Sequence, residues 1–501
     1  MRTCRPSRGR WGVGAGVAGV LAFLLAALPL AGADVAAVLK PATAFDEPEP
    51  FERNPGGATT QKEVHGRNAF SQPAANLSFE DRADFFIGNG LFRRLWVSAP
   101  SSTDTADGLG PLYNARSCQR CHLKDGRGHP PAGEDDSAVS MFLRLSVPPG
   151  RADVQDDFTA RRESVIPEPT YGAQLQDLAI PGHEAEGRMT IDYEEIPVEL
   201  AGGEVVHLRK PAYGVTDLGY GPMREDVMLS PRVAQPMIGL GLLEAIPEEQ
   251  ILAHADPGDR DGDGISGRAN LVWSEERQEP MLGRFGWKAG QPTLLQQSSS
   301  ALAGDIGVSN PLAPFPWGEC TKAETACREA PNGNSAQYDD LEAPIEMMDM
   351  ILFYVRHLAV PARRALYDAR TLWGKELFYD AGCIACHTPK FVTARDAAEP
   401  ALQYQLIWPY SDMLLHDMGD GLADHRPEGL ADGREWRTQP LWGIGLTAAV
   451  NGHTTFLHDG RARNLVEAIL WHGGEAQGPR DRFAAMTKEE REALIAFVNS
   501  L

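Results

Sequence analysis

The chain has 501 residues, a formal net charge of −22 and seven cysteines. A chain of this length exceeds one ordinary hydrophobic core, so we expect two or three domains. Such an acidic protein is a poor ligand for nucleic acid or an anionic membrane, but its charge is compatible with steering of a basic redox partner.

The first residues have the pattern of a secretory signal. Four arginines precede an apolar run over residues 11–30, and the small residues Ala31, Gly32 and Ala33 follow. This predicts a signal peptide over residues 1–33, cleaved after Ala33, and therefore a location in the periplasm. A retained membrane anchor is the alternative; no other stretch is apolar enough to span a bilayer. Residues 34–66, rich in Pro, Glu and Ala, are expected to form a flexible lead-in.

Two C-x-x-C-H motifs carry the main chemical signal of the chain. Their residues are Cys118, Cys121 and His122 in the first copy, and Cys383, Cys386 and His387 in the second. Two thiols at this spacing can bind the vinyl groups of one haem, and the histidine then ligates its iron. A zinc site would need a second ligand pair nearby, and a thioredoxin-like pair has no use for the histidine. The motifs therefore predict two covalently bound haem c groups.

Between the first motif and the later elements, residues from about 130 to 231 form an insertion. Proline-rich stretches and short alternating pieces, such as Met189–Tyr193 and Val205–Leu208, predict loops and short strands there. Elsewhere the apolar residues have helical spacing. Helices are expected over Phe79–Trp96, Pro344–His357, Leu372–Asp380 and Lys488–Leu501.

An acidic loop over residues 259–270 resembles the front half of a calcium-binding loop. The side chains of Asp259, Asp261 and Asp263 and the carbonyl of Ile265 would converge on one ion. Position twelve is Asn270 rather than Glu, so a bidentate carboxylate would have to come from elsewhere. Three aligned carboxylates repel one another without a cation, which favours calcium over an acidic turn without metal.

Two sets of short elements recur in the same order after each haem motif. The segment Gln235–Leu242 has a near twin in Gln439–Leu446, and Phe285–Trp287 with Leu294 is matched at identical spacing by Phe456–His458 with Leu465. Several matches in one order indicate an internal duplication. The sequence thus predicts a mainly α fold with two cytochrome c-like haem domains. The N-terminal haem domain would span residues 67–355, and the C-terminal one residues 356–501.

Gln297 and Asp305 follow the first of these repeated elements. Close to a haem iron, an amide and a carboxylate would suit peroxide, because they could hold it and move a proton to its leaving oxygen. Without a haem nearby, the same residues would only cap a solvent-facing helix. Further along, Cys320 and Cys327 bracket a short polar loop and most simply form a structural disulfide.

The sixth ligands of the two irons are the least determined feature. Near the second motif, Met418 is the expected ligand, in a segment that also offers Met413 and His416. For the N-terminal iron, the choice stays open between His183 or His207 of the insertion and an open sixth position.

Several segments resemble bacterial di-haem cytochrome c peroxidases and, more closely, the di-haem oxidoreductase family sometimes labelled thiol oxidoreductase. The segments that carry the resemblance are Gly108–Asn114, Arg284–Asn310, Trp436–Gly445, Phe456–Gly460 and Leu470–Ala476. The resemblance implies a periplasmic peroxidase-like enzyme with calcium between its haem domains. In it, the C-terminal haem receives electrons and the N-terminal haem meets peroxide.

Transferred residue by residue, the resemblance makes Trp287 an electron bridge between the haems and Gln297 the distal glutamine. The distal glutamate of the peroxidases finds only Asp305, which lies two positions short of the expected spacing. Their methionine ligand is missing from the equivalent stretch, Gly433–Thr438. A structural Cys320–Cys327 pair gives the thiol oxidoreductase label no support.

Taken together, we expect a periplasmic di-haem c-type oxidoreductase that reduces hydrogen peroxide. Its electrons would come from a small soluble partner, a cytochrome c or a cupredoxin. One alternative is an electron-transfer cytochrome with two closed haems and no catalysis. Another is a di-haem oxidase that acts on a protein or an organic substrate.

Overall fold

The computed structural model describes residues 35–62, 66–133, 136, 140–148 and 162–501. The predicted signal peptide over residues 1–33 lies outside these residues. The short helix α1 (Val35–Leu39) belongs to one unit, residues 1–40, and residues 41–501 form a second unit. In the described part of the chain, no helix is long and apolar enough to cross a membrane.

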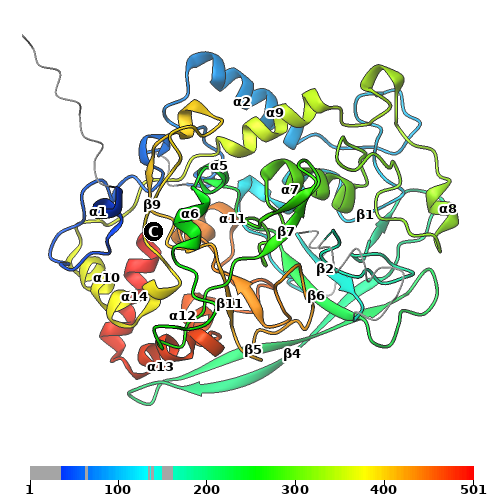
Figure 1. Cartoon of the computed structure of the whole chain (residues 1–501). Helices are drawn as coiled ribbons and strands as arrows, with labels where there is room; N and C mark the ends of the chain where they lie inside the picture. Colours follow the sequence, from blue (N-terminus) through cyan, green and yellow to red (C-terminus); the bar gives the residue numbers. More distant parts are fainter. Residues whose placement is uncertain (1–34, 63–65, 134–135, 137–139, 149–161) are drawn as a thin grey trace, which may run out of the picture. The chain divides into compact units, whose positions relative to one another are not determined.

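The longer helices of residues 41–501 pack in two pairs (Figure 1). One pair is α2 (Phe79–Phe92) with α9 (Ile345–Arg356), and the other is α10 (Ala369–Asp380) with α14 (Lys488–Ser500). These are the helices that the sequence predicts, with ends that differ by a few residues. For example, α10 begins before Leu372 because the side chain of Asp368 accepts a hydrogen bond from the backbone N–H of Thr371 and caps the helix there.

A glycine allows each pair to cross closely. A Cβ atom on Gly88 of α2 would lie 2.2 Å from the carbonyl oxygen of Met350, and one on Gly374 of α10 would lie 1.9 Å from that of Ala493. Each pair also reaches one C-x-x-C-H motif. The ring of Phe92 at the end of α2 lies 6.3 Å from that of His122, and the ring of Phe378 on α10 lies 6.0 Å from that of His387.

The remaining helices of this unit are short. They are α3 (Cys118–Cys121), α5 (Leu240–Glu244), α6 (Glu248–Leu252), α7 (Leu294–Ala301), α8 (Thr325–Arg328), α11 (Thr447–Asn451), α12 (Leu465–Leu470) and α13 (Gln477–Ala485). Tight helical turns complete them, among them η3 (Leu302–Ile306), η5 (Cys383–Ala385) and η8 (Gly474–Ala476).

In the part of the chain that the structure describes, the strands form six antiparallel pairs rather than one large sheet. The pairs are β1 (Leu112–Tyr113) with β3 (Leu178–Ala179), β2 (Met141–Ser146) with β6 (Met228–Val233), β4 (Arg188–Glu199) with β5 (Val205–Thr216), β7 (Leu271–Ser274) with β8 (Glu279–Leu282), β9 (Phe391–Val392) with β10 (Leu406–Ile407), and β11 (Leu415–Asp417) with β12 (Glu435–Arg437). The first three pairs fall in or beside the predicted insertion.

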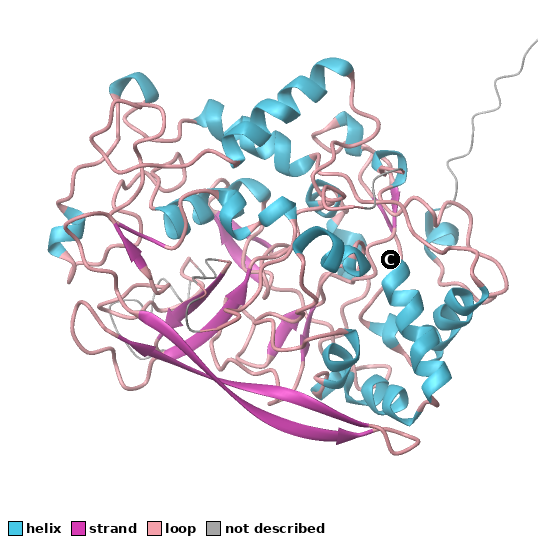
Figure 2. Ribbon diagram, turned by 180° about the vertical axis from the view of Figure 1, so that it is seen from behind, coloured by secondary structure: helices cyan, strands magenta, loops and turns pink. Residues whose placement is uncertain are grey.

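The longest pair, the β4–β5 hairpin, runs from the insertion to the C-terminal helices (Figure 2). Its turn contacts α13, where the N–H of Ala201 donates to the carbonyl of Ala484, and α14, where Arg491 pairs with Glu204 at 2.7 Å. Along β5, the hydroxyl of Tyr213 donates to Asp459. The hairpin therefore fastens the insertion of the first half onto the second half.

The prediction of a mainly α protein with two cytochrome c-like domains is wrong. Helix accounts for 29% of the described residues and strand for 17%, and the strands among them form six small sheets. The error has a physical cause: most of the strands have only two to six residues, too few for a period-two pattern to appear in the sequence. The predicted domain boundaries remain predictions.

The apolar core consists of two large clusters of buried side chains. The first includes residues of α2, α5, α7 and α9, and the second includes residues of α10, α12 and α14 together with Trp287, Trp408 and Trp436. Cys320 and Cys327 form the disulfide that the sequence predicts and lie in a smaller cluster with Leu112.

The repeated sequence elements adopt matching local structures. A backbone bridge joins Phe285 to Gln291 in one copy and Phe456 to Ala462 in the other. A side-chain cap then starts the helix in each copy, from Thr293 for α7 and from Asn464 for α12. The twin Gln–Pro elements contact each other, because the side-chain amide of Gln235 donates to Gln439 Oε1 at 2.5 Å. We call the segments 285–305 and 456–476 the matched segments.

The close helix crossing gives a prediction with an internal control. Gly88→Ala should lower the free energy of unfolding by about 1–3 kcal/mol, because the added methyl group meets the backbone of α9. Gly90→Ala, in the same helix, meets no atom within 4 Å and should raise it by up to about 1 kcal/mol. Urea denaturation of the two variants measures both changes. Equal stabilisation by both would contradict the close crossing.

Candidate functional site

The second C-x-x-C-H motif opens onto a cavity. Cys383, Cys386 and His387 all lie on its wall, together with apolar side chains of α10, α12 and α14. The empty space measures about 1410 Å³, including the part that is open to solvent. Two thiols and an imidazole therefore face one large, mainly apolar chamber.

The ring of His387 is held in one orientation. Its Nδ1–H donates to the carbonyl oxygen of Tyr410 at 2.9 Å, so the lone pair lies on Nε2. Burial lowers the pKa of His387 to about 4, which keeps the ring neutral at neutral pH. A neutral, oriented imidazole with a free Nε2 is what a metal ion requires.

Two buried guanidinium groups also line this cavity. Arg127 lies over the rings of Trp287 and Phe456, with 5.6 Å and 5.7 Å to the ring centroids. Arg437 donates to the carbonyl of Gly286 at 3.0 Å and to the side chain of Gln439 at 2.7 Å. Burial lowers the pKa of Arg127 to about 10 and that of Arg437 to about 9.

Neither Arg127 nor Arg437 forms an ion pair with a carboxylate of the described residues. Buried cations without a counter-charge are costly, so this cavity favours a ligand that brings anionic groups. A haem has two propionates, two vinyl groups and an iron. The two guanidinium groups, the two thiols and His387 match these features, so the residues of the cavity fit a haem.

Three further side chains in the cavity concern the sixth ligand. Met418, the ligand expected from the sequence, lies on the cavity wall, and so do His416 and His472. Both nitrogens of His416 are already engaged at 2.7 Å, Nδ1 by Glu475 and Nε2 by Asp412. His416 is therefore occupied as an ion-pair partner. His472 is a residue that the sequence reasoning missed.

The first motif is built in the same way. Helix α3 holds Cys118 and Cys121, and the Nδ1–H of His122 donates to the carbonyl oxygen of Gln235 at 2.8 Å. Burial lowers the pKa of His122 to about 4. His122, like His387, is thus a neutral ring with its Nε2 free, although the two carbonyls come from different parts of the fold.

Asp305 lies close to this first motif. Its backbone carbonyl accepts hydrogen bonds from the N–H groups of Asn114 and Ala115, just before the motif. Burial raises the pKa of the Cys118 thiol to about 12, and the nearby Asp305 carboxylate adds to this rise. The structure therefore brings Asp305, on the turn η3, to the first motif.

The Asp305 carboxylate is buried within a polar cluster. Gln174 donates to its Oδ1 at 2.9 Å and also donates to Asn114, which in turn donates to Asp177. Burial raises the pKa of Asp305, and Arg144 opposes this rise. Gln174 and Asp177 come from the insertion, and nothing in their sequence pattern points to this position.

Gln297 and His207 were also expected near the N-terminal iron, and neither of them forms a hydrogen bond with Asp305. Gln297 is half buried on α7, and its side chain makes no hydrogen bond with any described residue, Asp305 included. In the matched segments, Gln297 corresponds to Ala468, which lines the C-terminal cavity. His207, one candidate for the N-terminal sixth ligand, instead pairs with Glu195 on the exposed hairpin.

Trp287 lies between the two motifs. Its side chain lines the C-terminal cavity, and its indole N–H donates to the carbonyl of Val233 at 2.9 Å. Val233 stands two residues before Gln235, whose carbonyl holds His122. A short covalent path and two hydrogen bonds therefore join the first proximal histidine to the wall of the second cavity.

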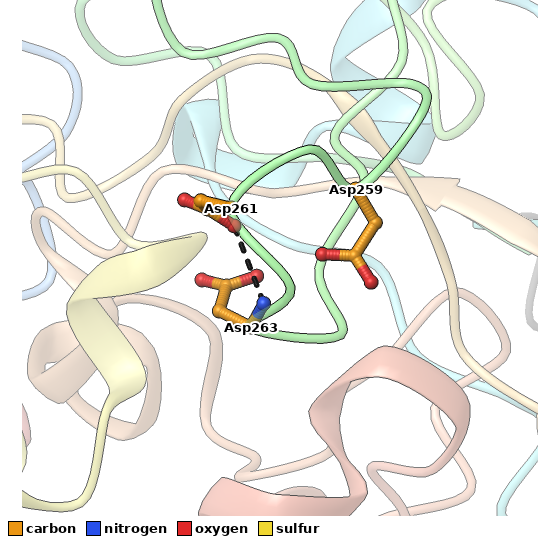
Figure 3. Close-up of side chains that lie close together, drawn as sticks. All are labelled: Asp259, Asp261 and Asp263. Carbon is orange, nitrogen blue, oxygen red and sulfur yellow. Dashed lines mark hydrogen bonds between the residues drawn. The ribbon is translucent and has the colours of Figure 1, made fainter.

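The acidic loop brings its three carboxylates together (Figure 3). One oxygen from each of Asp259, Asp261 and Asp263 lies within 4.8 Å of the others, at the exposed surface. Asn270 is not available as a ligand, because its side chain is already hydrogen-bonded. Its amide donates to the carbonyls of Lys288 and Glu428, and its oxygen accepts from the N–H of Leu430.

The acidic loop is joined to the C-terminal cavity. Ile265 lines the cavity, and the hydroxyl of Ser266 donates to Glu475 at 2.6 Å. Glu475 holds His416 in turn. The contacts from Ser266 to Glu475, from Glu475 to His416 and from His416 to Cys386 therefore connect the loop to the second motif.

Comparison with known proteins bears on the identity of the whole chain. No curated protein matches it. A family model described as "Di-haem oxidoreductase, putative peroxidase" matches residues 51–501, which include both C-x-x-C-H motifs, the polar cluster around Asp305 and the acidic loop. The family's name implies two haems, as the two motifs predict. The chain belongs to this family of di-haem oxidoreductases.

Proposed function

We propose that the protein is a periplasmic di-haem c-type peroxidase. Cys118 and Cys121 would bind one haem covalently, and Cys383 and Cys386 the other. The C-terminal haem would take electrons from a soluble donor, and the N-terminal haem would reduce hydrogen peroxide. The observation that carries this proposal is the buried, hydrogen-bonded Asp305 carboxylate beside the first motif.

Asp305 is suited to move a proton within bound peroxide. Gln174 occupies its Oδ1, so Oδ2 is free to accept a proton from one peroxide oxygen and return it to the other. The O–O bond would then break and the second oxygen would leave as water, and the first oxygen would become the second water with two electrons from the donor and two protons from solvent. Burial raises the pKa of Asp305, which makes it a stronger base than an exposed aspartate. The hydrogen bond from Gln174 fixes its orientation.

Gln297 is suited to hold the peroxide. Its half-buried side-chain amide is free of hydrogen bonds among the described residues, so it can donate to a polar ligand. Its counterpart Ala468 lines the C-terminal cavity, which supports a matching position for Gln297 at the N-terminal haem. Its N–H₂ would donate to a peroxide oxygen.

Trp287 is the proposed electron bridge. The indole lies on the wall of the C-terminal cavity and hydrogen-bonds the segment that holds His122. One aromatic side chain thus reaches from the segment that holds His122 to the cavity that contains His387. The net charge of −22 supports a basic donor, for which a small cytochrome c or a cupredoxin of positive charge is the class we propose.

We also propose calcium at the acidic loop. The carboxylates of Asp259, Asp261 and Asp263 and the carbonyl of Ile265 would be its protein ligands, with water at the remaining positions. A bound ion would hold the loop from which Ser266 contacts Glu475. Its role would be structural.

The role of Asp305 can be tested against a matched residue. Asp305→Asn should lower kcat for the peroxide-dependent oxidation of reduced cytochrome c by about 100-fold or more, because the proton acceptor is lost. Asp177→Asn, at the exposed end of the same polar cluster, should keep kcat within the same order of magnitude. Undiminished turnover by the Asp305 variant would remove this residue from the mechanism. Two six-coordinate haems inert to peroxide would favour an electron carrier.

The pH dependence of the reaction follows from the same group. Below the raised pKa of Asp305 the carboxyl group is protonated and cannot accept a proton. The kcat/KM for peroxide should therefore rise as the pH increases through this pKa, which lies above the ordinary value for aspartate. In Asp305→Asn this rising limb should be absent. If kcat/KM rises with pH in the same way in Asp305→Asn, the rise is caused by the titration of another group.

Calcium binding can be measured directly. Asp261→Asn should weaken calcium binding by about tenfold or more in isothermal titration calorimetry, because a ligand charge is removed. Asp420→Asn removes one exposed charge outside the loop and should leave the affinity unchanged. A wild-type protein that binds no calcium at millimolar concentration would make the loop an acidic turn only.

A further inference from the structure

His472 occupies a distinctive position on the wall of the C-terminal cavity. It stands just after α12, and its Nδ1–H donates to the carbonyl oxygen of Ala468 at 2.8 Å. Its Nε2 has no hydrogen-bond partner among the described residues. The ring is therefore oriented by the helix end and has one nitrogen lone pair free.

This arrangement is shared by the two histidines of the C-x-x-C-H motifs. In His122, His387 and His472 alike, Nδ1 is bonded to a backbone carbonyl at 2.8–2.9 Å. Such a bond fixes the tautomer and aims Nε2 at a metal ion. His472 and His387 also line the same cavity.

The other polar side chains of the cavity are less suited to iron. The two nitrogens of His416 are bound by carboxylates, and the nearby Asp412 and other partners raise its pKa despite burial. It is thus an imidazolium without a lone pair. Met418 is the remaining competitor, and its thioether is flexible, whereas the ring of His472 is already fixed. Gly473, next to His472, lies close to the backbone of Met418, so the two candidates are neighbours.

The matched segments give an independent argument. His472 stands seven residues after the first residue of α12, and the residue at the same distance along the other copy is Ala301, at the end of α7. The first copy therefore has a methyl group where the second has an imidazole. Only the second copy can provide a ligand at this position.

We propose that His472 is the sixth ligand of the C-terminal haem iron, in place of the Met418 that the sequence favours. This inference rests on haem binding at Cys383 and Cys386, as in the proposed function, but it does not depend on peroxide reduction. Ligation by two histidines closes this iron to substrate and gives a lower reduction potential than ligation by histidine and methionine. The methyl group of Ala301 offers no ligand atom at the corresponding position of the first copy.

Absorption and EPR spectra of the oxidised holoprotein test the ligand. The wild type should lack the long-wavelength absorption band of methionine sulfur bound to ferric haem. His472→Ala should lose the low-spin signal of one haem, and added imidazole should restore it, which a purely structural role would not allow. Met418→Leu should leave the spectra of both haems unchanged.

The opposite pattern would overturn the inference. A methionine–iron band in the wild type that disappears in Met418→Leu and persists in His472→Ala assigns the ligand to Met418. Haem content, measured for every variant by the pyridine haemochrome assay, separates a ligand effect from failed haem attachment. Peroxide turnover is measured independently, so an inactive protein with intact His472 ligation would end the proposed function and not this inference.

Discussion

The hydrogen bond from a buried histidine Nδ1 to a backbone carbonyl is the constraint around which the candidate sites are organised. It fixes the ring of His122 through Gln235 and that of His387 through Tyr410. In both cases burial alone would leave a neutral ring free to rotate, and the carbonyl selects the tautomer with Nε2 available. The carbonyl acceptors, Gln235 and Tyr410, come from segments outside the motifs, so the fold as a whole must place them. The close crossings at Gly88 and Gly374 hold the helices that reach each motif.

The two sites then differ in their buried charge. The C-terminal cavity has two guanidinium groups without carboxylate partners, Arg127 and Arg437, whereas the surroundings of the first motif contain the carboxylates of Asp305 and Asp177. Cations favour an anionic or reduced state nearby, and a buried carboxylate of raised pKa favours proton transfer. Opposite electrostatics around otherwise similar histidines are a physical basis for different tasks at the two sites.

Part of this arrangement could be read from the sequence. The helices α2, α9, α10 and α14 have long apolar periodicity and were predictable, as was the disulfide of Cys320 and Cys327. The placement of Asp305 beside the first motif followed from its position after a repeated element. The strand content did not follow, because strands as short as β9 and β11 have no detectable period. Gln174, Arg127 and His472 were missed because each is defined by contacts with segments far along the chain.

The acidic loop shows how a surface feature can act on a buried one. Ser266 at the end of the loop donates to Glu475, and Glu475 holds the imidazolium of His416. His416 Nδ1 lies 3.5 Å from the sulfur of Cys386, so this ion-paired imidazolium stands beside the second motif. A cation that orders the loop would fix Glu475 and thereby the position of that charge. His416 is itself flanked by the carboxylates of Asp412 and Glu475, so the loop is connected to a buried charged cluster beside the second motif without touching that motif.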